Sequence, residues 1–397
     1  MIFFLLGFSI LFDTFYLFHI NSINATIRPY DIVLTILAFR YLFDQKISIN
    51  YFYASSIILI FLINVISLSY TLDLSLGVRR LLIISKFLTA FLLFQAYHEV
   101  PSYRSKSLNG FILGGIVNLF ILSYQLIGKY LLDYDIVLKG GRPSGTLSEA
   151  DWLGPLLVIL SIIFLFGFSP FRSKSINVTF ALLFMLASFL TLTRGSWICS
   201  GAVLSYLFFV GGKLKIKKKE ILAVILVIVI IVSILVKLDS ESAYLDELTK
   251  RLAITYVTEE NDPASLTRFA EFNFSIEKLK EAPLFGYGIG SWHVLYPEGD
   301  EGREVFSSYL TIAFETGVIG LLLFFLFFRK IIVQRKYLLM SNIYKEYNFP
   351  PALIMSIFIV LFLMSIFYDA QRIMLYWYIL SFISLDYRNL RKNAYNH

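Results

Sequence analysis

Long apolar runs recur along this sequence from one end to the other. They are roughly 17–25 residues long, which is the length of helix that crosses the hydrocarbon core of a bilayer. Hydrophobic residues make up 57% of the chain and charged residues only 16%, so the runs lack the charged face that a soluble helix presents to water. The pattern predicts an all-α, polytopic integral membrane protein.

We expect about twelve transmembrane helices. The first run has no basic segment before it and no small-residue cleavage site after it, so we interpret it as a retained helix rather than a signal peptide. The expected spans lie near residues 2–20, 29–43, 52–70, 80–97, 110–131, 152–170, 177–193, 195–211, 221–237, 306–328, 350–368 and 371–386.

Basic residues in alternate connectors predict the orientation. If the N-terminus is cytoplasmic, every connector on that side is basic, as the positive-inside rule requires, and both termini are cytoplasmic. The net charge of +7 then reflects membrane topology, and we expect no nucleic-acid partner. The basic residues concerned are Lys46, Arg104, Lys106, Arg172, Lys174, the run 213–219, Arg329, Lys330, Arg335, Lys336, Lys345, Arg388, Arg391 and Lys392.

One large extracytoplasmic loop divides the sequence. We expect helices over 1–237, the loop over 238–305, and further helices with a cytoplasmic tail over 306–397, all within one integral membrane domain. The loop holds fourteen acidic and six basic residues, a net charge of −8. Its overall field repels anions, so an anionic ligand must be held by individual arginines.

The second half of this loop predicts an amphipathic helix of about 18 residues. Asp262 is placed to cap it, Pro263 suits its first position, and Pro283 follows its end. Its apolar stripe suits a membrane surface or the end of a helix bundle; the stripe comprises Leu266, Phe269, Phe272, Ile276 and Leu279. The glycines of 286–290 follow. No strand precedes them, which favours a tight turn over a phosphate-binding loop.

Several arginines lie on the predicted outer side, against the charge bias of that side. Arg142, Arg194 and Arg268 are the strongest candidates for binding an anion, because guanidinium groups match phosphate oxygens in bidentate geometry. Arg194 lies at the tip of a helical hairpin with almost no loop, where its charge is costly to bury. The alternative is pairing with an acid or a lipid headgroup, which we favour for Arg79 and Arg372. Arg80 directly follows Arg79 in the sequence.

Glu315 and His293 are the candidates for proton transfer. Glu315 lies two to three turns into an expected span, where a carboxylate is either functional or paired with an arginine of another helix. His293 is the one histidine of the large loop, and a lone loop histidine is more often incidental. Cys199 is the single cysteine and no histidine pair has metal-ligand spacing, so we expect no disulfide, no metal site and no cofactor.

Four segments together resemble the O-antigen ligase/polymerase-like superfamily, which includes O-antigen ligases and Wzy-type polysaccharide polymerases. They cover much of 140–325, and the last two are the most specific. In order they are Arg142-Pro-Ser-Gly-Thr146 followed by Asp151, Thr191-Leu-Thr-Arg-Gly-Ser196, Arg268 through Pro283-Leu-Phe-Gly-Tyr-Gly-Ile-Gly290, and Ser307-Ser-Tyr-Leu310 with Glu315-Thr-Gly-Val-Ile-Gly320.

The resemblance implies a metal-independent glycosyltransferase of a bacterial cytoplasmic membrane. Such an enzyme moves glycan from a polyprenyl-diphosphate carrier to a hydroxyl of an acceptor glycan at the outer face. By this resemblance the diphosphate is bound by Arg142, Arg194 and Arg268, the catalytic candidates are Glu315 and His293, and the acceptor or supporting groups are Asp151, Ser308 and Tyr309.

The sequence departs from the family at Phe306, where the family's ligases usually carry histidine. Phenylalanine cannot take a proton, so His293, Asp300, Glu304 and Glu315 stay open as the base. The departure favours a polymerase of O-antigen, capsule or exopolysaccharide over a ligase. A flippase or transporter is a third interpretation, although no two related halves are visible. The expected partners are the lipid-linked oligosaccharide, the acceptor glycan, the bilayer, and proteins of export or chain-length control.

Overall fold

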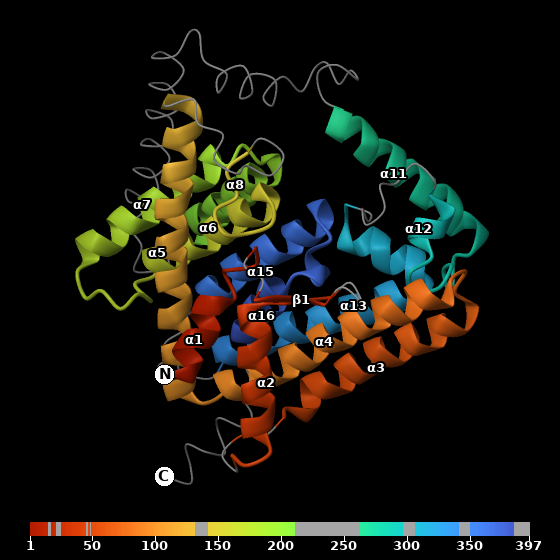
Figure 1. Ribbon diagram of the computed structural model, residues 1–397. Helices are drawn as coiled ribbons and strands as arrows, with labels where there is room; N and C mark the ends of the chain where they lie inside the picture. Colours follow the sequence, from red (N-terminus) through yellow and green to blue (C-terminus); the bar gives the residue numbers. More distant parts are fainter. Residues whose placement is uncertain are drawn as a thin grey trace. The chain divides into compact units, whose positions relative to one another are not determined.

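The computed structural model describes residues 1–14, 17–20, 25–44, 47, 49–131, 142–210, 263–296, 306–340 and 350–384, and these are almost entirely helical (Figure 1). The predicted helical class is therefore confirmed. The lysine run 213–219, the expected span 221–237, Asp262, Asp300 and Glu304 lie outside the described residues, and the domain boundaries at 237 and 305 stay predictions.

Three described helices are long and apolar enough to cross a membrane. They are Tyr51–Tyr70, Pro101–Gly128 and Ser308–Val333. Shorter apolar helices cover Ala150–Leu165, Lys174–Leu190, Pro351–Phe367 and Met374–Ile383, which correspond to four further expected spans. The number of twelve stays a prediction.

The chain divides into two compact units, each built from separate stretches of sequence. The first comprises Met1–Ile36, Ser105–Tyr256 and Ala352–Leu363, and the second Leu37–Arg104, Val257–Pro351 and Met364–His397.

The first unit is centred on α6 (Ala150–Leu165), which is buried along nearly its whole length and packs against α7 (Lys174–Leu190) and α8 (Arg194–Val210). Helix α1 (Ile2–Ser9) lies against α5 (Pro101–Leu131). A side chain at Gly110 would collide with the backbone of α1, so a small residue here permits the close approach.

The expected first span, residues 2–20, is not one continuous helix. Helix α1 ends at Ser9, and residues 18–20 form strand β1 (Phe18–Ile20), which pairs antiparallel with β2 (Ala25–Ile27). Between them lies Asp13, which is buried and accepts hydrogen bonds from Arg28, Tyr30 and Ser148. A buried carboxylate must be paired, and Asp13 meets these partners from an irregular segment rather than from a continuous helix.

The second unit pairs α3 (Tyr51–Ser67) with α13 (Ser308–Met340), and α4 (Leu74–His98) with α16 (Met374–Ile383). Edge-to-face aromatic contacts join these helices, with the Phe91 ring 5.4 Å from that of Phe327 and 6.0 Å from that of Trp377. The remaining elements include α2 (Pro29–Tyr41), α15 (Pro351–Phe367) and the short helices η2 (Leu68–Tyr70) and η5 (Ala370–Arg372).

The predicted amphipathic helix is confirmed as α11 (Pro263–Glu281), which packs against α13. Its expected apolar stripe is not the side that packs. Phe269 is 65% exposed and Phe272 is also exposed, whereas Glu271 and Ser275 are buried. The inward side instead carries Glu271, which accepts a hydrogen bond from the backbone amide of Phe306, and Phe274, which packs against Trp292 and Tyr296.

Candidate functional site

A break in α13 organises the second unit. Gly317 adopts φ 67° and ψ −168° in the middle of this helix, so the helical hydrogen bonds fail around it. The loop after α11 replaces them: Val318 donates to the Pro283 carbonyl at 2.9 Å, and Tyr287 donates to the Phe314 carbonyl at 2.9 Å. Broken helices are tolerated at membrane depth where protein groups satisfy the freed backbone, as they do here.

Glycine is required on both sides of this contact. Gly286 and Gly317 both have positive φ, and a Cβ on either would collide with a backbone oxygen of the other segment, Phe314 O or Leu284 O. The two sequence motifs, in 283–290 and 315–320, are therefore two halves of one interlocked structure. The amides of Tyr287, Gly288 and Gly290 all donate within the protein, as a tight turn requires.

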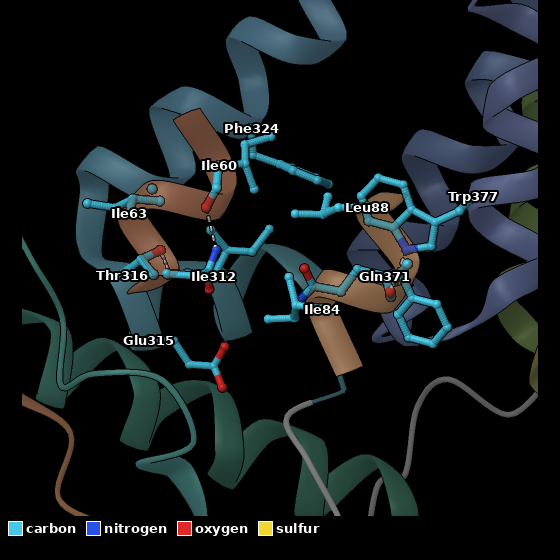
Figure 2. Close-up of a pocket in the computed structure, with 13 residues that line it drawn as sticks. Ile60, Ile63, Ile84, Leu88, Ile312, Glu315, Thr316, Phe324, Gln371 and Trp377 are labelled. Carbon is cyan, nitrogen blue, oxygen red and sulfur yellow. Dashed lines mark hydrogen bonds between the residues drawn. The ribbon is translucent and has the colours of Figure 1, made fainter. Parts of the chain in front are cut away.

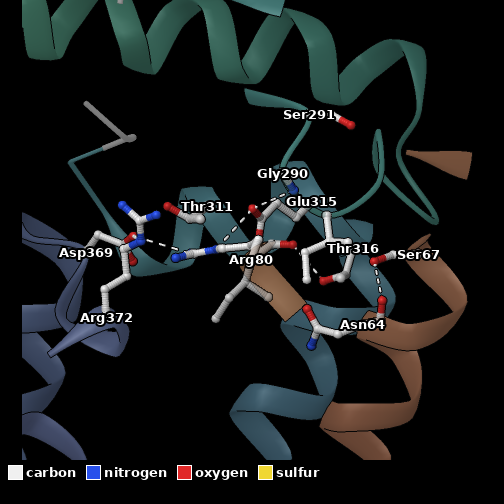
Figure 3. A network of polar contacts seen from close by, with 12 residues as sticks. Asn64, Ser67, Arg80, Gly290, Ser291, Thr311, Glu315, Thr316, Asp369 and Arg372 are labelled. Atoms are coloured by element: carbon white, nitrogen blue, oxygen red, sulfur yellow. Dashed lines mark hydrogen bonds and ion pairs between the residues drawn. The ribbon is translucent and has the colours of Figure 1, made fainter. Parts of the chain in front are cut away.

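Glu315 lies beside the break and is 4% exposed. Its Oε1 accepts a hydrogen bond from the Gly290 amide at 3.1 Å and lies 3.3 Å from Nε of Arg80 (Figure 3). The carboxylate thus connects three elements: α13, the glycine turn and α4. This geometry is that of a buried ion pair, which is destabilising to break from one side.

Arg80 continues the network (Figure 3). It is 3% exposed, and its Nη2 lies 3.5 Å from Oδ2 of Asp369, which in turn lies 3.4 Å from Nε of Arg372. The four charges alternate in sign from Glu315 to Arg372, whose side chain is 27% exposed. Buried charges thereby lead to a cation that reaches the surface.

A narrow cavity of about 20 Å³, with Glu315 at one edge, is lined by residues of α3, α4, α13 and α16 (Figure 2). Its walls are mostly apolar, with Glu315, Thr316 and Gln371 as polar members. This volume suits about one water molecule, so a sugar or a polyprenyl chain cannot bind there.

His293 lies on the short helix α12 (Trp292–Leu295) and is half-buried. Burial, together with Arg372 and Arg80, lowers the pKa of His293 below its ordinary value of 6.5, against the opposing effect of Glu315. The ring is therefore neutral at pH 7 and able to accept a proton. Burial also raises the pKa of Asp369, to about 6, despite the nearby Arg80.

Aromatic packing fixes α12 in place. Trp292 stacks on Tyr296 at 4.8 Å and meets the rings of Phe314 and Phe274 edge-on at 5.2 and 5.7 Å. Phe274 comes from α11 and Phe314 from α13, so the helix that carries His293 is clamped between both.

Arg268 lies on α11 with its guanidinium carbon 6.0 Å from the centre of the Tyr368 ring, a cation–π distance. Tyr368 directly precedes Asp369. Its carbonyl accepts hydrogen bonds from the amide and hydroxyl of Ser308, at 3.1 and 3.2 Å. Ser308 therefore ties the start of α13 to the turn that carries Asp369, while the Tyr309 ring stacks on Phe325 at 5.3 Å.

The remaining predicted site residues belong to the first unit. Arg142 and Asp151 form a two-pronged ion pair, with distances of 2.7 and 3.4 Å. Arg194 is half-buried at the first position of α8, next to the buried hydroxyl groups of Thr193 and Ser196. Leu192, just before it, has φ 55° and is fully buried, which is a strained conformation for a leucine.

The structure thus places Arg268, His293, Ser308, Tyr309 and Glu315 in one unit and Arg142, Asp151 and Arg194 in the other. Sequence reasoning missed Asp369 and Glu271. For Arg372 it favoured pairing with an acid or a lipid headgroup, and the structure pairs it with Asp369. One usable signal was present: Asp369 is the single acid between the last two expected spans, three residues before Arg372. Spacing alone did not reveal that Asp369 also meets Arg80.

Comparison with known proteins gives one family. Residues 178–325 match the family model described as O-antigen ligase. The matched region contains Arg194, Arg268, His293 and the broken helix with Glu315, whereas Arg80, Arg142 and Asp369 lie outside it. No curated protein matches the chain.

Proposed function

Since the match of residues 178–325 supports membership of the O-antigen ligase/polymerase-like superfamily, we propose that this protein is a polymerase of a bacterial cell-envelope polysaccharide. It transfers glycan from a polyprenyl-diphosphate carrier to an acceptor glycan at the outer face of the cytoplasmic membrane. The observation that supports the proposal is the charged network of Glu315, Arg80 and Asp369, with Arg268 against the ring of the adjacent Tyr368 and with His293 on α12.

The reaction needs one bond to form and one to break. The acceptor hydroxyl oxygen attacks the anomeric carbon of the donor glycan, and the bond from that carbon to the diphosphate oxygen breaks. The bonding electrons leave with the polyprenyl diphosphate, and the hydroxyl proton passes to His293. Negative charge grows on the leaving group in the transition state, so preorganised cations accelerate the step.

In this proposal Arg268 supplies such a cation, and Arg194 is a second candidate that rests on the sequence alone. Arg142 is the third candidate, and its guanidinium is held at 2.7 Å by Asp151. Arg142 must give up this bidentate pair to bind a phosphate. Asp151 then serves to orient Arg142.

Glu315 acts through its neighbours in this proposal. Its carboxylate is occupied by Arg80 and by the Gly290 amide, so it holds the turn that precedes His293 rather than meeting the acceptor itself. Ser308 and Tyr309 support the start of α13 in the same way. His293 is left as the described group best suited to accept the proton.

Phe306 favours polymerase over ligase. It occupies the position where the family's ligases usually carry histidine, and its amide donates to the buried carboxylate of Glu271 at 3.4 Å. This position therefore supplies a backbone contact and a side chain that cannot take a proton. A base for transfer must come from elsewhere, which is consistent with His293.

A product analysis distinguishes the three functions. The purified chain in lipid nanodiscs is given short polyprenyl-diphosphate oligosaccharide, with EDTA and without nucleotide sugar. A polymerase makes a ladder of longer lipid-linked glycans. Transfer only to an added foreign acceptor would indicate a ligase instead. Unchanged substrate, together with its movement across reconstituted vesicles, would refute the enzyme proposal.

A further inference from the structure

A groove between α3 and α13 lies on the second unit, separate from the charged network. It has a volume of about 350 Å³ and is open along one side. Its wall is formed by leucines of both helices, Leu59, Leu323 and Leu326. One end carries two adjacent cations, Arg329 and Lys330. The groove is thus apolar along its length and positive at its end.

The two cations differ in how they are held. Lys330 donates to the Phe52 carbonyl at 2.6 Å and to the Ser55 hydroxyl at 3.0 Å, and its ammonium lies 4.7 Å from the centre of the Phe52 ring. These contacts fix it at the start of α3. Arg329 is exposed and also lines the groove. The fixed ammonium and the exposed guanidinium place two positive charges beside the groove, and both groups can donate to an anion.

The position along the helix suits a lipid. The span Ser308–Val333 of α13 is long and apolar enough to cross a membrane, and Arg329 and Lys330 lie in its last turns. A phospholipid beside this span has its acyl chains next to the leucines and its phosphate next to the cations. Basic pockets between transmembrane helices bind anionic lipid headgroups for this reason.

We propose that this groove is a specific site for an anionic phospholipid of the bilayer. The phosphate group contacts Arg329 and Lys330, and an acyl chain lies along Leu59, Leu323 and Leu326. Zwitterionic lipid has the same chains but offers a compensated charge, so it binds less well. The site is independent of the glycan chemistry proposed above.

Native mass spectrometry of the full chain in detergent tests this, with phosphatidylglycerol and phosphatidylcholine of identical chains as the probes. We expect phosphatidylglycerol to be retained preferentially. Arg329→Gln should weaken its retention about fivefold, the effect of one surface cation, and leave phosphatidylcholine unchanged. Arg172→Gln is the matched control, because it removes an exposed arginine that lines no described groove; it should have no effect.

A second pair of variants tests the apolar part. Leu326→Trp fills the groove and should reduce retention of both lipids, whereas Leu322→Trp, at an exposed position on the same helix outside the groove, should not. Unchanged elution on size exclusion shows that each variant is folded. Equal retention of both lipids by the parent chain, an Arg329→Gln result equal to the parent, or full displacement of lipid by glycerol phosphate alone would overturn the proposal.

Discussion

At the scale of single residues, the central feature is a carboxylate that holds other groups in place. Glu315 accepts from Gly290 and pairs with Arg80, and Arg80 reaches on to Asp369. A buried ion pair contributes little net stability, yet removing one partner leaves the other charge unmatched. The network therefore fixes the relative positions of the segments that carry these residues, in addition to any effect on stability.

A double-mutant cycle on Glu315→Gln and Arg80→Met measures this coupling. Each single variant should lower the free energy of unfolding in mixed micelles, and the double variant should lose less than the sum. For groups in contact the interaction free energy is about 0.5–3 kcal/mol. Additive losses would show that the two side chains do not act together.

His293 gives a prediction about pH. Because its pKa is lowered below 6.5, it stays neutral as the pH falls to that value, and elongation should decline only in more acidic solution. His293→Gln should reduce the rate by roughly 10²–10⁴-fold and abolish this acid limb. A variant that is slower but keeps the same limb would assign the proton transfer to another group.

At the scale of elements, two segments far apart in sequence complete one another. The turn 283–290 supplies the hydrogen bonds that α13 loses at Gly317. This arrangement makes the position of α12, and hence of His293, depend on a backbone that only glycine can adopt. The stability of the site and its geometry are therefore set by the same few residues.

Gly317→Ala should destabilise the protein by more than about 1–3 kcal/mol, the cost of forcing a side chain into this backbone region, because the new Cβ also collides with the Leu284 carbonyl. Gly201→Ala is the control. Nothing lies within 4 Å of a Cβ added at this position, so the higher helix propensity of alanine should make this variant neutral or stabilising. Thermal unfolding in detergent compares them. Equal midpoints for the two would remove the argument for an interlocked turn.

The bounds of some helices follow from the sequence, whereas the contacts that orient or end others do not. The caps and spacing of α11 predict its bounds closely, because those signals are local. No local signal predicts that Glu271 points inward, because its partner is the amide of Phe306, which is distant in sequence. The end of α1 at Ser9 was also not predicted, because it depends on residues distant in sequence. A single Asp13 does not interrupt an apolar run by itself, but in the structure it binds Arg28 and Ser148.

At the scale of the whole molecule, sequence reasoning offered pairing of arginines with acids as an alternative but did not identify the partners. Asp369 and Arg372 are three residues apart, whereas Arg80 lies on α4, and no spacing rule connects it with either of them. Arg142 and Asp151 are closer in sequence, only nine residues apart, and both were predicted as site residues. They were given two separate roles, however, and not predicted to pair with each other. Tertiary contacts decide which charge meets which.

The predicted orientation can be tested through the single cysteine. Cys199 is buried, and Cys199→Ala gives a cysteine-free chain in which new thiols report their side of the membrane. In intact cells, Glu277→Cys on α11 should react with an impermeant maleimide, whereas Arg172→Cys in a predicted cytoplasmic connector should not. Labelling of both, or only of the second, would contradict the topology.

The most direct test of the proposed function follows both products of one reaction. Polyprenyl-diphosphate oligosaccharide is incubated with the parent chain, with Arg268→Ala, and with Lys280→Ala as an exposed control on the same helix. We predict one polyprenyl diphosphate released for each glycan extension in the parent and in Lys280→Ala, and neither product in Arg268→Ala despite normal membrane insertion. Extension by Arg268→Ala at the parent rate, or extension without release of the carrier, would contradict the proposal.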